Sequence, residues 1–317
     1  MRTTESRAMT LTDVPMLRRY QGRGVILDAE FHMTHDPAAG PTSYLSSLLF
    51  NRGIYSYLAR TNGDEVIGQF RFKGDDVNAH LLYAGPDYED VSEDAWLALM
   101  DVLAREAGKL GAHALTAAID VDSPLFEIMR RTRFACYMRQ RVWQHAPLQA
   151  QPTLPLTEES SSDQIGIMAL MCHTIPTLQQ SVAIPTNEGQ GLVYRVQQQV
   201  EAYIAVTEGR HGVYLLPFIH LDVVPQARDI LTSAIAMIPA AARVPVYVGV
   251  RSYQSWLDRV IEEMGFTPVA EQAVMVRQIA AGVRHVAFTR GKLNGKLEPA
   301  HRVTPPYWSS ARPHDED

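Results

Sequence analysis

The chain of 317 residues has few cysteines and no long hydrophobic run. Only Cys136 and Cys172 occur, and the apolar residues that flank each of them predict two reduced, buried thiols without a redox or catalytic role. No run reaches the roughly 18 apolar residues of a membrane-spanning helix. The N-terminal segment also has no apolar stretch of signal-peptide length. These absences predict a cytoplasmic protein without a membrane partner.

Positive charge is also scarce. The 29 Lys and Arg residues are outnumbered by 35 Asp and Glu residues, and the formal net charge is -6. Because affinity for nucleic acid depends largely on clustered cations, no nucleic-acid partner is expected. With 46% hydrophobic and 20% charged residues, the composition is that of an ordinary globular protein. The length suits two domains of about 150 residues each.

The common motifs of several enzyme classes are missing. There is no Gly-x-Gly-x-x-Gly after a strand, no His-Glu-x-x-His and no Gly-x-Ser-x-Gly. Residues 291–296 look like a P-loop fragment, but the spacing is short and Leu297 replaces the Ser or Thr that would bind Mg²⁺. His32 and His35 have no further ligand pattern around them, so we expect solvated loop histidines and no metal site.

The chain does contain a segment that occurs twice. Residues 243–278 have the pattern of a strand, a turn, an amphipathic helix ending at Gly-Phe, and another strand, and residues 114–144 repeat this plan. Aligning Phe134 with Phe266 brings the preceding apolar strands into step to within one residue. The repeat indicates a duplication.

The segments before each repeat also correspond. Each half opens with a short apolar strand and a Thr-acid pair ahead of a helical pattern, with Asp13 and the run Ser160 to Asp163 as candidate caps. Asn62-Gly63 and residues 209–211 each predict a hairpin, followed by a helix rich in Leu, Ile, Met and Ala. Strands, a helix, a strand, a second helix and a last strand predict an α+β (mixed α/β) fold.

Proline marks the boundary between the halves. The uncharged stretch APLQAQPTLP holds three prolines, which suits a linker. The predicted organisation is a first domain over residues 1–145, a linker over 146–155, a second domain over 156–279 and an extension over 280–317. The extension is locally basic before an acidic end. We expect a solvated tail there, with a lid, a partner-binding arm or an anion site as alternatives.

The order of elements resembles the GNAT acyltransferase superfamily, in which tandem pairs also occur. The resemblance covers nearly all of residues 9–279 and rests on the Thr-acid opening, the hairpin, the strand-loop-helix segments at 81–103 and 214–235, and the Phe-strand endings. It implies two GNAT-like domains, each a twisted mixed sheet flanked by helices. It also implies acetyl-CoA or another acyl-CoA as cofactor, held by a basic Gly-rich turn at a helix start.

The first half departs from this pattern at the cofactor loop. Residues 87–94 contain five acids and no base. These acids would cap the following helix themselves, with Asp90 and Glu93 at capping-box spacing, and a pyrophosphate would meet like charge. The family's general-acid Tyr is replaced by Met129 in this half and by Ile261 in the second, so neither half has that route of proton delivery.

The second half keeps more of the family's cofactor site. The resemblance implies that backbone groups of Ile219 and Leu221 align the pantetheine arm. Pro225 at the first helical position removes only a donor that would lack a partner anyway, so the next N–H groups are expected to be free for the pyrophosphate. The residues that carry them are Gln226, Ala227 and Arg228.

Polar side chains also end two neighbouring strands of the second half. Arg251 and Tyr253 follow one strand, and His220 ends the other. Arg251 is expected to bind the molecule that accepts the acyl group. His220 and Tyr253 are the predicted catalytic residues, since His220 suits acid-base chemistry by its intrinsic pKa. A satisfied polar residue at a strand end is the structural alternative for His220.

Two functions are consistent with these patterns. One is acyl transfer from acyl-CoA to an amine or another small-molecule acceptor. The other is a non-catalytic binding or scaffold protein, a pseudoenzyme that keeps the fold and has lost the cofactor. An open groove with free N–H groups at residues 226–228 would favour the enzyme, and a groove filled by side chains would favour the binding protein. The acceptor, the acyl length and homo-oligomer formation stay open.

Overall fold

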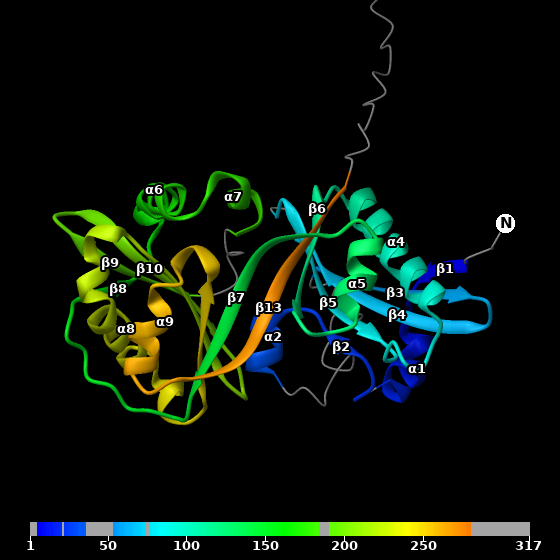
Figure 1. The fold of residues 1–317 in the computed structure, drawn as a ribbon, viewed down its shortest axis with the longest axis horizontal. Helices are drawn as coiled ribbons and strands as arrows, with labels where there is room; N and C mark the ends of the chain where they lie inside the picture. The colour runs from blue at the N-terminus through cyan, green and yellow to red at the C-terminus, as the bar shows by residue number, and fades with distance from the viewer. Residues whose placement is uncertain (1–4, 21, 36–52, 74–75, 184–189, 280–317) are drawn as a thin grey trace, which may run out of the picture. The chain divides into compact units, whose positions relative to one another are not determined.

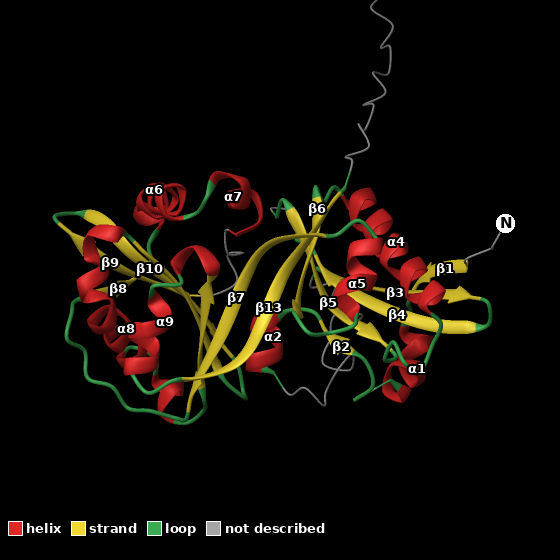
Figure 2. Cartoon of the chain, viewed as in Figure 1, coloured by secondary structure: helices red, strands yellow, loops and turns green. Residues whose placement is uncertain are grey.

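The computed structural model describes residues 5–20, 22–35, 53–73, 76–183 and 190–279. Within them, thirteen strands form one mixed sheet with helices packed on it (Figure 1; Figure 2). The predicted mixed α/β fold, with a sheet flanked by helices in each half, is confirmed. The predicted extension over residues 280–317 lies outside the described residues.

The elements follow the predicted order in both halves. The strands of the first half are β1 (Glu5–Ala8), β2 (Val25–Ile26), β3 (Ile54–Thr61), β4 (Asp64–Arg71), β5 (Asn78–Gly85), β6 (Ala114–Asp120) and β7 (Ala135–His145). Those of the second are β8 (Leu156–Glu158), β9 (Gln190–Val196), β10 (Gln199–Glu208), β11 (Val213–Ile219), β12 (Val246–Arg251) and β13 (Thr267–Gln278). The described helices are α1 (Val14–Arg19), α2 (Ala29–Thr34), α4 (Glu93–Leu110), α5 (Leu125–Arg131), α6 (Gln164–Thr174), α7 (Thr177–Ala183), α8 (Ala227–Ala236) and α9 (Leu257–Glu263).

Tight turns join antiparallel strands at the predicted positions. Asn62 and Gly63 join β3 to β4 with φ values of 55° and 92°. Both central residues of a type I′ turn need this left-handed conformation, which explains why Asn-Gly occurs here. Residues 209–212 join β10 to β11 and include the predicted turn residues 209–211. Both hairpin predictions are confirmed.

One predicted helix cap is confirmed and another is wrong. Ser160 and Asp163 form a capping box, in which the Asp163 carboxylate accepts the Ser160 backbone N–H at 2.9 Å. At α4 the N-cap is Ser92, and its N–H is accepted by Asp64 of β4 at 2.9 Å. Asp90, expected to cap α4, instead pairs with Arg23 at 2.7 Å. A carboxylate that is distant in sequence takes the place of the local one.

Helices cover both faces of the sheet. In β11, Leu215 packs with α8 and α9, whereas its neighbours Tyr214 and Leu216 pack with α6 and α7. Because successive side chains of a strand point to opposite faces, these two helix pairs lie on opposite faces of the second half. In the first half, α4 and α5 pack on a core that includes Leu81 and Leu115.

The last strands of the two halves change places. β13, the last strand of the second half, lies between β6 and β7 of the first, and β7 lies between β13 and β12 of the second. Figure 1 shows these two strands side by side in green and orange. The predicted domain limits describe how the two halves follow each other along the chain, and they stay a prediction. In the sheet, each half is completed by the last strand of the other.

An approximate two-fold relation runs between β7 and β13. Gln140 of β7 is paired with Gln272 of β13, at a separation of 132 residues. Each strand carries one extra, unpaired residue at the same separation, Tyr137 in β7 and Val269 in β13. The aligned phenylalanines of the sequence repeat have this separation too. The halves therefore share one plan down to their β-bulges, as a duplication would leave them.

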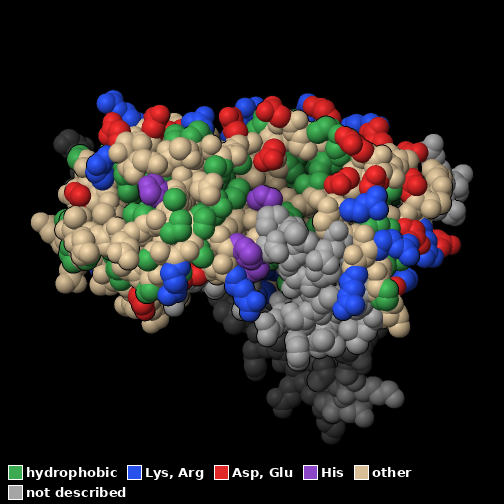
Figure 3. All heavy atoms as spheres, turned by 90° about the horizontal axis from the view of Figure 1, so that it is seen from below, with side chains coloured by type: hydrophobic (Ala, Val, Ile, Leu, Met, Phe, Trp, Pro, Cys, Tyr) green, Lys and Arg blue, Asp and Glu red, His purple; other side chains and the backbone are tan. Residues whose placement is uncertain are grey.

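The prediction of buried thiols is wrong, because Cys136 and Cys172 are both exposed. Cys172 follows the buried Met171 in α6, and successive helical residues point about 100° apart, so an apolar neighbour does not imply burial. Cys136 lies near the start of β7. No described helix is long and apolar enough to span a membrane. Figure 3 shows Lys and Arg side chains interspersed with Asp and Glu on the face seen from below.

Candidate functional site

Each half contains one parallel strand pair that opens along its length. In the first half, residues 78–80 of β5 pair with residues 114–116 of β6, and the pairing then ends. In the second half, residues 213–215 of β11 pair with residues 246–248 of β12 and then diverge in the same way. The resemblance implies an acyl thioester in such an opening. What occupies each opening therefore bears directly on function.

The opening of the first half is occupied by the chain itself. β2 pairs antiparallel with β5, matching Val25 with Ala84. Beyond β2, Leu27 donates its N–H to Leu82 of β5 at 2.9 Å and accepts the N–H of Ala118 of β6 at 2.8 Å. Its side chain is 1% exposed. The backbone of Leu27 thus bridges the two diverging strands.

The opening of the second half is bridged by a side chain. Gln254, in the short 3-10 helix η6 (Ser252–Gln254), donates to the carbonyl of Pro217 at 3.0 Å and accepts the N–H of Ile219 at 3.1 Å. It is 3% exposed. Ile219, predicted to align a pantetheine arm, therefore has its N–H bonded within the protein.

The predicted pyrophosphate loop is also internally bonded. A 3-10 helix, η4 (Leu221–Gln226), runs directly into α8, and the N–H of Ala227 is accepted by the carbonyl of Val224. The expectation that this N–H is free is wrong, because the preceding turn continues the helical hydrogen bonding. Leu221 is exposed on the surface of η4.

The side chains of this loop have protein partners as well. Arg228 donates to the carbonyl of Glu263 at the end of α9 at 2.7 Å. Gln226 accepts the hydroxyl of Tyr194 at 2.7 Å. Cations favour the carbonyl end of a helix, so Arg228 has a structural role in this arrangement.

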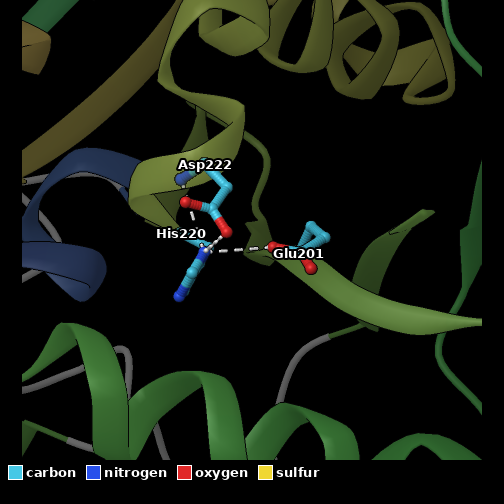
Figure 4. A group of neighbouring side chains, drawn as sticks. All are labelled: Glu201, His220 and Asp222. Atoms are coloured by element: carbon cyan, nitrogen blue, oxygen red, sulfur yellow. Dashed lines mark hydrogen bonds and ion pairs between the residues drawn. The ribbon is translucent and has the colours of Figure 1, made fainter. Parts of the chain in front are cut away.

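The two predicted catalytic residues lie in different surroundings. Nδ1 of His220 is 3.2 Å from Glu201 and 3.5 Å from Asp222. Figure 4 marks both contacts with dashed lines. The hydroxyl of Tyr253 is buried without a partner among the described residues, and burial raises its pKa. No hydrogen bond within the described part of the chain joins His220 to Tyr253. Their joint catalytic role stays a prediction.

Arg251 ends a row of polar residues that crosses four strands. Asp120 of β6 pairs with Gln272 of β13, which pairs with Gln140 of β7, which pairs with Arg251 of β12. Directly paired side chains lie on the same face of a sheet, so the row points to one side. Gln272 donates to Asp120 at 3.3 Å, and Gln140 donates to Gln272 at 2.8 Å. We name these residues the polar ladder.

The ladder is incomplete at the end that belongs to the second half. Gln140 is 3% exposed, yet its Oε1 atom has no partner among the described residues. The neighbouring Arg251 likewise has a buried Nε without a partner among the described residues, and its Nη1 contacts the sulfur of Met138 at 3.3 Å. Buried polar groups are nearly always hydrogen-bonded. These two atoms therefore lack the partners that such sites usually have.

Gln140 and Arg251 both line a cavity of about 80 Å³ where the halves meet. Its walls include two acids, Glu30 of α2 and the N-cap residue Asp28. Arg71 of β4 also lines the cavity and lies 3.9 Å from Asp28. Glu30 accepts the hydroxyl of Thr207 at 3.3 Å. Burial raises the pKa of Glu30, and Asp28 raises it further, whereas Arg71 and Arg251 act in the opposite direction. Both signs of charge thus meet in one small space.

Sequence patterns identified only part of this arrangement. Arg251 was expected at a ligand site, and it lines the cavity. Gln140, Gln254 and Leu27 were missed. The one available signal is that Gln140 and Gln272 occupy equivalent places in the repeat.

Comparison with known proteins supports the fold. No family model matches the sequence, and no curated protein sequence matches it. Among solved structures, a GCN5-related N-acetyltransferase from Sphaerobacter thermophilus matches with a TM-score of 0.54 and 12% identity, over 88% of this chain and 97% of the other. A tandem GNAT protein from the clavulanic acid biosynthesis pathway matches with a TM-score of 0.53 and 12% identity, over 88% and 99%. This chain therefore has the fold of the tandem GNAT proteins.

Proposed function

We propose that this protein is a non-catalytic binding protein of the tandem GNAT fold, which holds a small polar molecule in the cavity between its halves. The observation that carries the proposal is the incomplete end of the polar ladder. Gln140 and Arg251 both line the cavity, and the Oε1 atom of Gln140 and the Nε atom of Arg251 are buried without partners among the described residues. A ligand that supplies the matching groups relieves this cost, which is about 1–3 kcal/mol for each group.

The charges around the cavity suit a zwitterion. Arg251 can bind a carboxylate. An ammonium group can donate hydrogen bonds to Gln140 and to the acids Asp28 and Glu30. A water molecule needs about 10–15 Å³ of such space, so a cavity of about 80 Å³ admits a ligand of only a few heavy atoms. A small amino acid is the ligand class that fits best.

The closed openings support a binding protein over an acyltransferase. In the first half, the backbone of Leu27 already makes the strand contacts that a pantetheine arm would need. In the second, the side chain of Gln254 makes them. Acyl-CoA binding would require one of these groups to leave and expose buried polar atoms.

One observation favours acyl transfer in the second half as the alternative. His220 stands 3.2 Å from the Glu201 carboxylate, and a carboxylate-held imidazole suits a general base acting on an amine acceptor. In that function an acyl-CoA would displace Gln254 from β11. Transfer of a labelled acetyl group to an amine by the full chain would establish this alternative.

Thermal unfolding in the presence of small ligands tests the proposal. Glycine and alanine are expected to raise the melting temperature by several degrees, because a ligand at a hundred times its Kd stabilises by about 2.7 kcal/mol. Acetate and methylamine, which each carry one of the two charges, should act more weakly. In Arg251→Met, the affinity for glycine should fall about tenfold or more.

Arg259→Met is the matched control, because Arg259 is exposed on α9 and, among the described residues, forms an ion pair with Glu263 alone. This variant should bind glycine as the wild type does. Unchanged affinity in Arg251→Met would refute the proposed ligand pose. An absence of any shift with the whole panel at saturating concentration would refute a zwitterion site altogether.

A further inference from the structure

Three potential metal ligands meet on the second half, away from the cavity. Glu201 lies in β10, His220 directly after β11, and Asp222 in η4. The N–H of His220 donates to the carbonyl of Glu201 at 2.9 Å. This bond continues the backbone pairing of β10 with β11 and sets the two residues opposite each other. Asp222 comes two residues later, where η4 turns the chain back. Figure 4 shows all three side chains converging.

The contacts of His220 conflict with one another when no cation is bound. Nδ1 lies 3.2 Å from Glu201, 3.5 Å from Asp222, and 3.4 Å from the backbone N–H of Asp222. The two carboxylates require a proton on Nδ1, whereas the N–H requires a lone pair there. A single proton also satisfies only one carboxylate at a time. No single protonation state of Nδ1 therefore makes all three contacts as hydrogen bonds.

A divalent cation would reconcile the two carboxylates with the imidazole. We propose that Glu201, His220 and Asp222 bind one divalent transition-metal ion of the Zn²⁺ type. Tetrahedral Zn²⁺ with bonds of about 2.0–2.2 Å places neighbouring ligand atoms about 3.4 Å apart. The separations of 3.2 Å and 3.5 Å from Nδ1 match this value, and the three ligand atoms lie within 4.8 Å of one another.

The charge at the site also favours a cation. Within the described residues, neither Glu201 nor Asp222 forms an ion pair with Lys or Arg, and the ion pairs of both involve His220 alone. Imidazole suits Zn²⁺, Cu²⁺, Ni²⁺ and Fe²⁺, whereas Mg²⁺ and Ca²⁺ prefer oxygen ligands alone. Three protein ligands leave an open coordination position for water or another ligand.

Calorimetric titration of Zn²⁺ into the full chain, freed of metal by chelation, tests this proposal. One site per chain is expected, with Mg²⁺ giving no comparable heat. Asp222→Asn should weaken Zn²⁺ binding by at least about tenfold. Because Asp222 is 81% exposed, the loss of its charge should leave folding intact. His220→Asn should abolish binding at this site, and circular dichroism would show whether that variant is folded.

His211→Asn is the matched control, because His211 is exposed in the turn between β10 and β11 and is not part of the cluster. It should bind Zn²⁺ like the wild type. Equal affinity in the wild type and Asp222→Asn, or a loss in His211→Asn as large as in Asp222→Asn, would overturn the proposal. The outcome is independent of the glycine experiment, because the two sites share no residue.

Discussion

Replacing Gln254 by leucine is expected to lower the free energy of unfolding by about 3 kcal/mol, since two buried polar groups each lose a partner at about 1–3 kcal/mol. Leucine has a similar volume, so the core should stay filled. The N–H of Ile219 and the carbonyl of Pro217 would remain without the bonds that Gln254 makes. Urea denaturation, with the midpoint and slope compared between wild type and variant, measures the change.

Gln199→Leu provides the comparison, because Gln199 is exposed at the start of β10. It should change stability by less than about 0.5 kcal/mol, as surface substitutions usually do. If Gln254→Leu were as stable as Gln199→Leu, the side chain of Gln254 would not be closing the opening of the second half.

Leu27→Ala is expected to destabilise the protein by about 2–5 kcal/mol. The side chain of Leu27 is 1% exposed in the core of the first half, together with residues of α4 such as Trp96 and Leu99. Its removal leaves a cavity at the point where the backbone of Leu27 bridges β5 and β6. Denaturation in urea would give the loss directly.

The same truncation at Leu178 is the control, because it removes a leucine side chain that lies outside the core. Leu178 is 86% exposed on α7, so Leu178→Ala should be nearly neutral. A loss below about 1 kcal/mol in Leu27→Ala would show that the segment containing β2 is only loosely docked in the opening of the first half.

Local sequence patterns predicted most of the elements but not α2, and the prediction of solvated loop histidines is wrong for His32, which lies half-buried in that helix. Asn62-Gly63 sets its turn through backbone conformation alone, and the repeated endings at Phe134 and Phe266 marked the duplication. Strand partners were not accessible in this way. β7 and β13 have equivalent patterns, because they are copies, so periodicity alone does not show that each completes the other half. Exchange depends on three-dimensional packing.

The candidate site was predictable only where a side chain stood at a strand end. Arg251 was identified for that reason. The partners of Gln140 and Gln254 lie at least 35 residues away in sequence, beyond the range of any local pattern. The acids of residues 87–94 predict that the first half does not bind a pyrophosphate, and this stays a prediction. The residue that fills the opening of this half is Leu27, an ordinary apolar residue in the sequence.

The protein's own groups occupy the openings of both parallel strand pairs. Titration of acetyl-CoA into the full chain by isothermal calorimetry tests most directly whether these openings are closed to the cofactor. The closed openings predict no binding heat up to millimolar cofactor. A one-to-one isotherm with a Kd in the micromolar range, weakened by Arg228→Ala, would contradict the claim and restore the second half as a cofactor site.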